Sequence, residues 1–356
     1  MAANPAHIFR LAGWALRAVV RAGGDAWRAG AVVPHVHGLA AYERNQNGGW
    51  RLKRRRQFRL NEVVRLKLRA AKEVFKASTR IGLARDVVVS RYHEEGLLAN
   101  LLHALEVIHR VRPDARVHVD WTLTGKEAGF RYGKKGDDVW GQLFRPVGEP
   151  PKRAAYPAWR RLDMAFWGKG KDYLTGRRLQ RHREAYHSTA LKWLEITSPR
   201  VLGQVEEIAA RSFDGCFCIG VHRRVGNVLV AELQKNGRIP SLESVIETVE
   251  SCVAIATREI SPNYAVFLAT DDADAVETFK RASFGPRLVV RDDVQRTTAD
   301  GAEVHFGDWG NLSITDAEDV LIDTLLLSQC NVLIHMSSSV STVAAILNPD
   351  LILMRA

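Results

Sequence analysis

Three cationic side chains directly follow an apolar run in the middle of the chain. The run covers residues 216–221 and is followed by His222, Arg223 and Arg224. A buried strand that ends in an imidazole and two guanidiniums is costly unless those groups meet an anion. Ligands of open α/β sheets bind at the carboxyl ends of the strands, and the planar fork of arginine suits phosphate oxygens. We therefore expect a diphosphate site at the end of this strand.

Two further apolar runs end in polar residues. Residues 264–270 precede Asp271 and Asp272, and residues 331–335 precede Ser337, Ser338 and Ser339 at the start of an expected helix. Backbone N–H groups and hydroxyls at a helix N-terminus can hold a phosphate. The alternative is structural, because the aspartates and serines also suit helix caps and the arginines can pair with the aspartates. Together, the three strand ends favour a nucleotide-diphosphate site at one edge of one sheet.

The elements that must position these groups alternate along the chain. We expect strands at 87–90, 116–121, 216–221, 264–270, 287–290 and 331–335, and helices at 97–108, 240–256, 275–282, 316–328 and 343–347. This alternation is typical of α/β folds with parallel sheets. We predict a basic helical N-terminal arm at 1–84 and two Rossmann-like domains, at 85–205 and 206–356. Two such domains that face a cleft form the GT-B arrangement.

Composition adds limits on the class of protein. The chain has 356 residues and is 46% hydrophobic, which is enough for two domains. Its four cysteines (Cys216, Cys218, Cys252 and Cys330) lack metal-ligand spacing. They indicate buried apolar residues in a reducing compartment, and neither a disulfide framework nor a zinc site.

The basic charge is concentrated in the N-terminal arm. The whole chain carries a net charge of +11, and residues 1–80 contain 17 Lys and Arg against four acids, so the remainder carries −2. Helical periodicity predicts amphipathic helices at 7–22 and 60–76, with the basic run 51–56 between them. Three interpretations stay open: association with an anionic membrane surface, ordinary packing with solvated charges and, as the weakest, nucleic-acid binding. The arginines of the arm exclude a transmembrane span, and no cleavage site marks a signal peptide. We therefore expect a cytoplasmic protein. If the arm binds lipid, the protein is expected to be peripheral on the inner face of the cell membrane.

Residues from about 214 to 350 resemble the α1,6-fucosyltransferase superfamily, which includes rhizobial nodulation fucosyltransferases and animal core N-glycan fucosyltransferases. Four segments carry the resemblance in order: residues 219–227, 266–272, 320–329 and 332–340. It implies a GT-B, inverting, metal-independent transferase that uses GDP-β-L-fucose and needs no cofactor. Residues 85–205 then form the acceptor side, and residues 206–356 bind the donor.

The resemblance also implies roles for single residues. By position, Arg224 matches the essential diphosphate-binding arginine of the family, and His222 matches the histidine that accompanies it. Asp323 matches a residue that contacts the nucleoside, and Ser338 matches a residue that contacts the diphosphate. Asp271 and Asp272 match a segment beside the donor. Glu232 falls on the proposed base of the animal enzymes. Arg223 departs from the family, which has an apolar residue there. The expected donor-binding set also includes Arg223, Asn227, Ser337 and Ser339, and no metal site is expected.

These observations predict a function and two alternatives. The expected reaction moves L-fucose from GDP-fucose to a glycan hydroxyl of a surface polysaccharide, a lipid-linked glycan or an oligosaccharide. The first alternative is a transferase of the same fold that uses another nucleotide sugar. The second is a non-catalytic, membrane-associated protein that keeps the fold.

Overall fold

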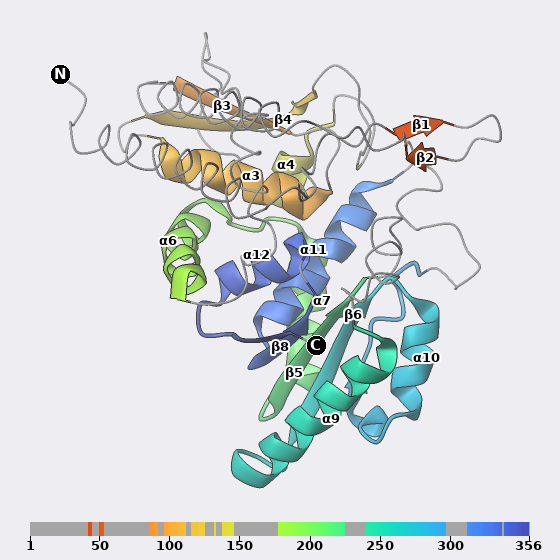
Figure 1. The fold of residues 1–356 in the computed structure, drawn as a ribbon. Coiled ribbons are helices and arrows are strands. Elements are labelled where there is room, and N and C mark those ends of the chain that lie inside the picture. The colour runs from red at the N-terminus through yellow and green to blue at the C-terminus, as the bar shows by residue number, and fades with distance from the viewer. Residues whose placement is uncertain are drawn as a thin grey trace, which may run out of the picture. The chain divides into compact units, whose positions relative to one another are not determined.

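The computed structural model describes residues 42–44, 50–52, 86–91, 96–111, 115–124, 132, 137–145, 177–224, 240–296, 312–336 and 338–355 (Figure 1). The chain divides into two compact units. The first comprises Met1–Val88, Arg110–Arg116 and Pro151–Gly170, and the second comprises Val89–His109, Val117–Pro150 and Lys171–Ala356. The expected domain limits at residues 84 and 205 stay predictions.

A five-stranded parallel sheet organises the C-terminal half of the second unit. It contains β5 (Phe217–Arg223), β6 (Tyr264–Thr270), β7 (Leu288–Val289), β8 (Val332–His335) and β9 (Ile352–Arg355). The strand order is β7-β6-β5-β8-β9, and every neighbouring pair is parallel. The predicted α/β class with a parallel sheet is therefore confirmed, and β5 lies at the centre of that sheet.

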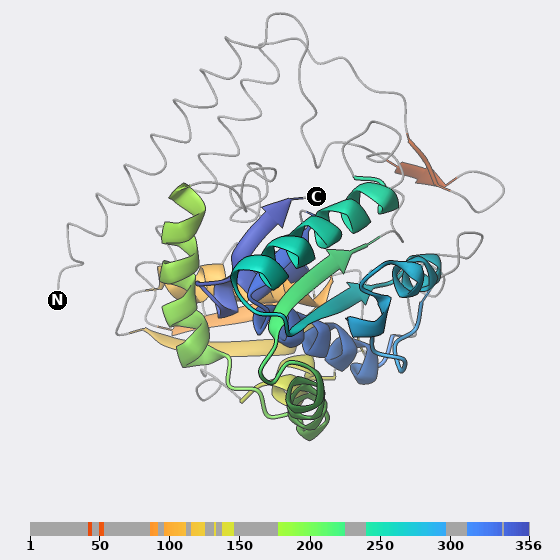
Figure 2. The same cartoon turned by 90° about the horizontal axis from the view of Figure 1, so that it is seen from below.

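Helices cover both faces of this sheet (Figure 2). One face packs against α9 (Leu242–Glu259) and α10 (Ala273–Arg281). The other face packs against α11 (Ile314–Ser328), which in turn contacts α7 (Pro199–Ser212) and α12 (Ser339–Leu347). Burial on both faces explains why the strands are continuous apolar runs.

Side chains of β5 alternate between these two faces, as strand geometry requires. Ile219 and Val221 pack into the core beneath α9 and α10. Gly220 faces α11, since a Cβ added there would lie 3.0 Å from both Leu327 Cδ2 and Cys330 Sγ. The same alternation directs His222 towards the α11 and α12 face, and Arg223 towards the α9 and α10 face.

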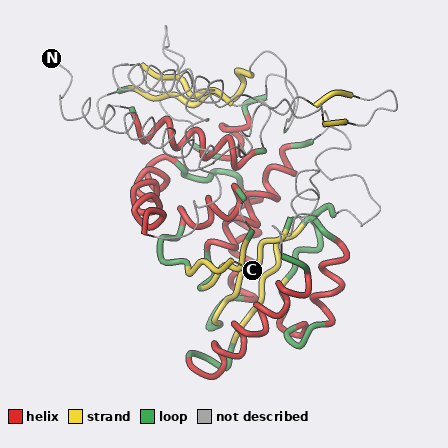
Figure 3. The backbone as a smooth tube through the Cα atoms, viewed as in Figure 1, coloured by secondary structure: helices red, strands yellow, loops and turns green. Residues whose placement is uncertain are grey.

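The expected elements of this unit are confirmed, with corrections at the end of β5 and at the start of α12, which begins at Ser339 and not at residue 343. Helices and strands alternate through it as predicted (Figure 3). The predicted strand end at Val221 is wrong by two residues, because His222 pairs with Ala269 and His335, and Arg223 pairs with Thr270. His222 and Arg223 are therefore strand residues and not loop residues. Only Arg224 follows the strand.

Helices without individual bounds were expected between about residues 122 and 200, where α4 (Val139–Leu143) and α6 (Arg177–Trp193) lie. Helix α7 and strand β9 were not predicted. Helix α6 is tied to the C-terminal end of α12 by Arg183, which is only 5% exposed. Arg183 donates to the carbonyl oxygens of Ala345, Asn348 and Leu351 at 3.0, 2.8 and 2.8 Å. This arginine thus satisfies carbonyls that the end of a helix leaves unpaired.

The upstream elements also follow the prediction. Strand β3 (Asp86–Arg91), helix α3 (Leu97–Arg110) and strand β4 (Arg116–Thr124) occur in the expected order, and β3 pairs with β4. Trp121 of β4 packs edge-on against Trp140 of α4, and both side chains are fully buried.

Little of the basic arm belongs to the described residues. They include an antiparallel pair, β1 (Tyr42–Arg44) and β2 (Trp50–Leu52). The helices expected at 7–22 and 60–76 lie outside the described residues and stay predictions. Within the described part of the chain, no helix has the length and apolarity needed to cross a membrane.

The close approach at Gly220 generates a stability prediction. Replacing Gly220 with Val should lower the free energy of unfolding by about 1–3 kcal/mol, because the added methyl groups overpack the contact with Leu327 and Cys330. Urea denaturation monitored by circular dichroism measures this change. Gly203→Ala is the matched control, since nothing lies within 4 Å of its added Cβ. It should be neutral or gain up to about 1 kcal/mol from helix propensity. Equal stability of the two variants would contradict the packing.

Candidate functional site

The end of β5 brings together His222 and the N-terminus of α12. His222 is 7% exposed, and its Nδ1 lies 3.1 Å from Ser338 Oγ and 3.0 Å from Ser341 Oγ. Ser338 is the N-cap of α12, and its Oγ accepts a hydrogen bond from the Ser341 backbone N–H at 3.1 Å. Two predicted site residues, His222 and Ser338, are therefore in contact, and Ser341 joins them although the sequence analysis missed it.

The environment of His222 keeps its imidazole neutral. Burial, the charge of Arg224 and the neighbouring His335 lower the pKa of His222 to about 3. At neutral pH one ring nitrogen therefore donates a hydrogen bond and the other accepts one. His222 contributes hydrogen bonds to this site and no positive charge.

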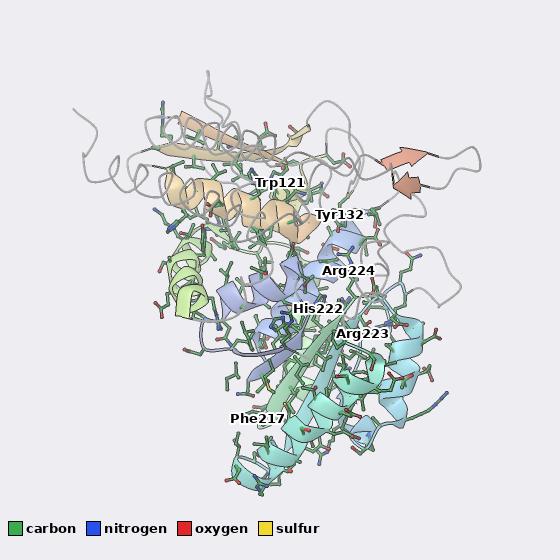
Figure 4. The ribbon with its side chains drawn as sticks, viewed as in Figure 1. Trp121, Tyr132, Phe217, His222, Arg223 and Arg224 are labelled. Atoms are coloured by element: carbon green, nitrogen blue, oxygen red, sulfur yellow. The ribbon has the colours of Figure 1, made fainter. Side chains whose placement is uncertain are left out.

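Arg224, labelled with His222 and Arg223 in Figure 4, has the most exposed side chain of the three residues. Its side chain is 35% exposed, whereas that of Arg223 is 9% exposed. The backbone N–H of Arg224 donates to Met336 Sδ at 3.1 Å, which anchors the residue beside β8. Its Nε lies 3.9 Å from Asp271 Oδ2, too far for a hydrogen bond. The Arg224 side chain is thus partly exposed, and its Nε makes no hydrogen bond to Asp271.

Arg223 lies on the opposite face of the sheet. Its Nε lies 3.8 Å from Asp272 Oδ2, and burial lowers its pKa while Asp272, Asp271 and Glu243 raise it. Asp272 also caps α10, because its Oδ1 accepts from the N–H groups of Asp274 and Ala275 at 3.0 and 3.1 Å. The sequence left open whether these aspartates serve a ligand or a structural network. Asp272 serves structurally as the cap of α10, and it lies beside the Arg223 guanidinium without a hydrogen bond to its Nε.

Asp323 lies on α11 and is held by an arginine that the sequence analysis missed. Arg291 Nη1 donates to Asp323 Oδ1 at 3.1 Å, and the Arg291 side chain is only 2% exposed. Burial raises the pKa of Asp323 to about 6, although Arg291 opposes this rise. Arg291 follows the expected strand at 287–290 directly, so its place after an apolar run was an available signal.

The remaining predicted residues are placed only in part. Ser339 is the first residue of α12. Asn227, Glu232 and Ser337 lie outside the described residues, so their expected roles stay predictions. Within the described ranges, no group of three or more His, Cys, Asp or Glu side chains is arranged to hold a metal ion.

The described arrangement has the properties of an anion site. Helix α12 presents its N-terminus, where the helix dipole and unpaired N–H groups favour negative charge. Ser338 and neutral His222 add hydrogen-bonding groups, and Arg224 adds an accessible positive charge. These groups come from the carboxyl ends of β5 and β8, which are neighbours in the sheet.

Comparisons with known proteins give matches only among solved structures. No protein-family model and no curated protein matches the chain. The chain is similar to fucosyltransferase NodZ from Bradyrhizobium, with 17% identity and a TM-score of 0.42 over 75% of this chain and 94% of that one. NodZ alpha-1,6-fucosyltransferase soaked with GDP-fucose gives 17% identity, a TM-score of 0.43, and 75% and 93% coverage. A mutant of Arabidopsis thaliana FUT1 in complex with GDP gives 13% identity, a TM-score of 0.40, and 79% and 73% coverage.

The lowered pKa of His222 generates a prediction for pH-dependent stability. At pH values between about 3 and the ordinary pKa of 6.5, His222 binds a proton in the unfolded chain but not in the folded chain. Protonation therefore favours the unfolded chain, and the free energy of unfolding falls as the pH falls through this range. The stability advantage of the wild type over His222→Asn should therefore shrink by about 2 kcal/mol from pH 7 to pH 5. Urea denaturation at both pH values measures it. An advantage that stays constant would show that His222 is not held neutral.

Proposed function

We propose that the chain is an inverting glycosyltransferase of the GT-B class that moves L-fucose from GDP-fucose to a glycan hydroxyl. One observation carries the proposal: accessible Arg224, neutral His222 and the Ser338 cap of α12 meet at the carboxyl edge of the parallel sheet. These are the positions that the four sequence blocks match to the family's diphosphate-binding residues. The site thus offers groups of the right kind for a nucleoside diphosphate.

In the proposed reaction, the acceptor hydroxyl oxygen attacks the anomeric carbon of fucose. The bond from that carbon to the β-phosphate oxygen breaks, and GDP leaves with the electron pair. Negative charge that develops on the β-phosphate is stabilised by Arg224, with hydrogen bonds from His222 and the N-terminus of α12. Glu232 is proposed to take the proton of the hydroxyl. The reaction is proposed to proceed without a metal ion.

The nucleotide and the acceptor define the finer parts of the proposal. Thermal-shift titration with GDP, UDP, CDP and TDP sugars should give the largest shift with GDP-fucose. A larger shift with another donor would favour a transferase of the same fold that uses another sugar. Absence of any nucleotide binding would favour a non-catalytic protein that keeps the fold. Transfer assays against a panel of glycans would identify the acceptor among polysaccharide, lipid-linked and soluble oligosaccharide substrates.

The basic arm belongs to a separate part of the proposal. We propose that residues 1–84 attach the enzyme to the cytoplasmic face of a membrane, since basic residues near anionic lipid contribute roughly 1 kcal/mol each. Sedimentation with liposomes that contain phosphatidylserine tests this attachment. Binding that persists after deletion of residues 1–80 would contradict it.

Arg224 supplies the direct test of the proposed function. Arg224→Ala should lower the affinity for GDP by about 10- to 100-fold and abolish detectable transfer, because a charge-assisted contact to phosphate is lost. Isothermal titration with GDP and turnover of GDP-fucose measure the two effects.

The matched control for this test is Arg258→Ala. Its side chain is 73% exposed in the last turn of α9, and it should leave both affinity and turnover unchanged. Retained turnover in Arg224→Ala, with its fold confirmed by circular dichroism, would refute the assignment of the diphosphate site.

A further inference from the structure

Arg291 lies at the centre of an acidic cluster formed by Asp293, Asp319 and Asp323. Its Nη2 donates to Asp319 Oδ1, Asp293 Oδ2 and Gln204 Oε1 at 2.7, 3.0 and 3.0 Å. Its Nη1 donates to the Asp319 carbonyl oxygen at 3.0 Å and to Asp323 Oδ1 at 3.1 Å. Five hydrogen bonds hold a side chain that is 2% exposed, so the direction of the guanidinium is fixed.

This cluster lies on the same face of the sheet as His222. In the sheet register, Val289 pairs with Phe267 and Phe267 pairs with Gly220. Two residues further along β5 and β6, His222 pairs with Ala269, and Arg291 follows the end of β7 by two residues. Arg291 contacts α11 and α7, and His222 contacts α12, so both point to the helices of that face.

The two oxygens of Asp323 have different surroundings. Oδ1 is bound by Arg291. Oδ2 has no hydrogen-bond partner among the described residues. It keeps some contact with solvent, since the Asp323 side chain is 18% exposed. Arg291 therefore leaves one oxygen of Asp323 accessible as a hydrogen-bond acceptor, in a direction set by the buried guanidinium.

Resting on the proposed use of GDP-fucose, we propose that Arg291 is a positioning residue for nucleobase recognition. Arg291 fixes Oδ1 of Asp323 so that Oδ2 accepts from the N1–H edge of guanine. Adenine has a lone pair at the same ring position, which a carboxylate oxygen repels. The geometry of Arg291 thus determines the preference of the site for guanine.

The charge of Arg291 has a second effect on the same acceptor. Burial and Asp319 raise the pKa of Asp323, and Arg291 and Arg296 lower it, with the result at about 6. Asp293 also faces Arg291 and competes for its charge. Asp323 is therefore ionised at neutral pH and is protonated as pH falls through about 6. A protonated Asp323 loses the acceptor that guanine requires, so GDP affinity should fall below this pH.

The test compares GDP with ADP in the full-length protein by isothermal titration. The wild type should prefer GDP by at least about 100-fold, as a site built to accept an N–H rejects a base that lacks it. Arg291→Lys keeps the charge but loses the fork, and it should reduce this preference about tenfold. Asp323→Glu keeps both charges but moves the carboxylate by one methylene, and it should also reduce the preference. It serves as the second variant if Arg291→Lys does not fold.

Arg200→Lys is the matched control, because Arg200 binds the same cluster without contacting Asp323. Its guanidinium contacts Asp319, Asp293 and Glu318 at 2.6, 3.3 and 3.4 Å. This variant should lower stability and leave the ratio of GDP to ADP affinity unchanged. If folded Arg291→Lys or Asp323→Glu keeps the wild-type ratio of GDP to ADP affinity, the inference is overturned. The proposed function still stands in that case, provided that the wild type binds GDP. Absence of GDP binding by the wild type would overturn both.

Discussion

The cost of burying cationic groups at the end of the central strand governs the structure of this edge. The three cationic residues meet this cost in different ways. His222 gives up its charge, Arg223 lies beside Asp272, and Arg224 leaves the strand and is partly exposed. Of these three residues, only Arg224 has a positive charge that is accessible to an anion. Arg224 is therefore the strongest candidate among them for an anion contact.

Parallel register extends this arrangement across the sheet. Because β5 pairs with both β6 and β8, the ends of these strands lie level, and α12 begins beside His222. On the same face, Arg291 connects the end of β7 to α11 and α7. The sheet therefore supports two neighbouring groups, one suited to a phosphate and one that directs a carboxylate. A nucleotide combines the two chemical features that these groups would recognise.

Much of the fold could be predicted because buried strands are apolar on both faces. The strand at 264–270 matched residue for residue. The end of β5 was misplaced because charged residues usually mark the end of a strand, whereas pairing on both sides continues it through Arg223. Helix α7 was missed although Ser198 and Pro199 form a recognisable start, with Ser198 accepting from the Val201 N–H. Ser341 and Arg291 were missed since their partners are 119 and 28 residues away in the chain.

The amino-acid sequence by itself determined the alternation of strands and helices and the types of residue at the strand ends, because both follow from local patterns of polarity. Tertiary structure decided on which face of the sheet each side chain lies and which of the titratable side chains there are ionised. Arg223 and Arg224 are chemically identical neighbours, and only strand pairing and the packing of α9, α10 and α12 distinguish them. The ionisation of His222 and Asp323 likewise depends on burial and on charges brought near by folding, which no local pattern specifies.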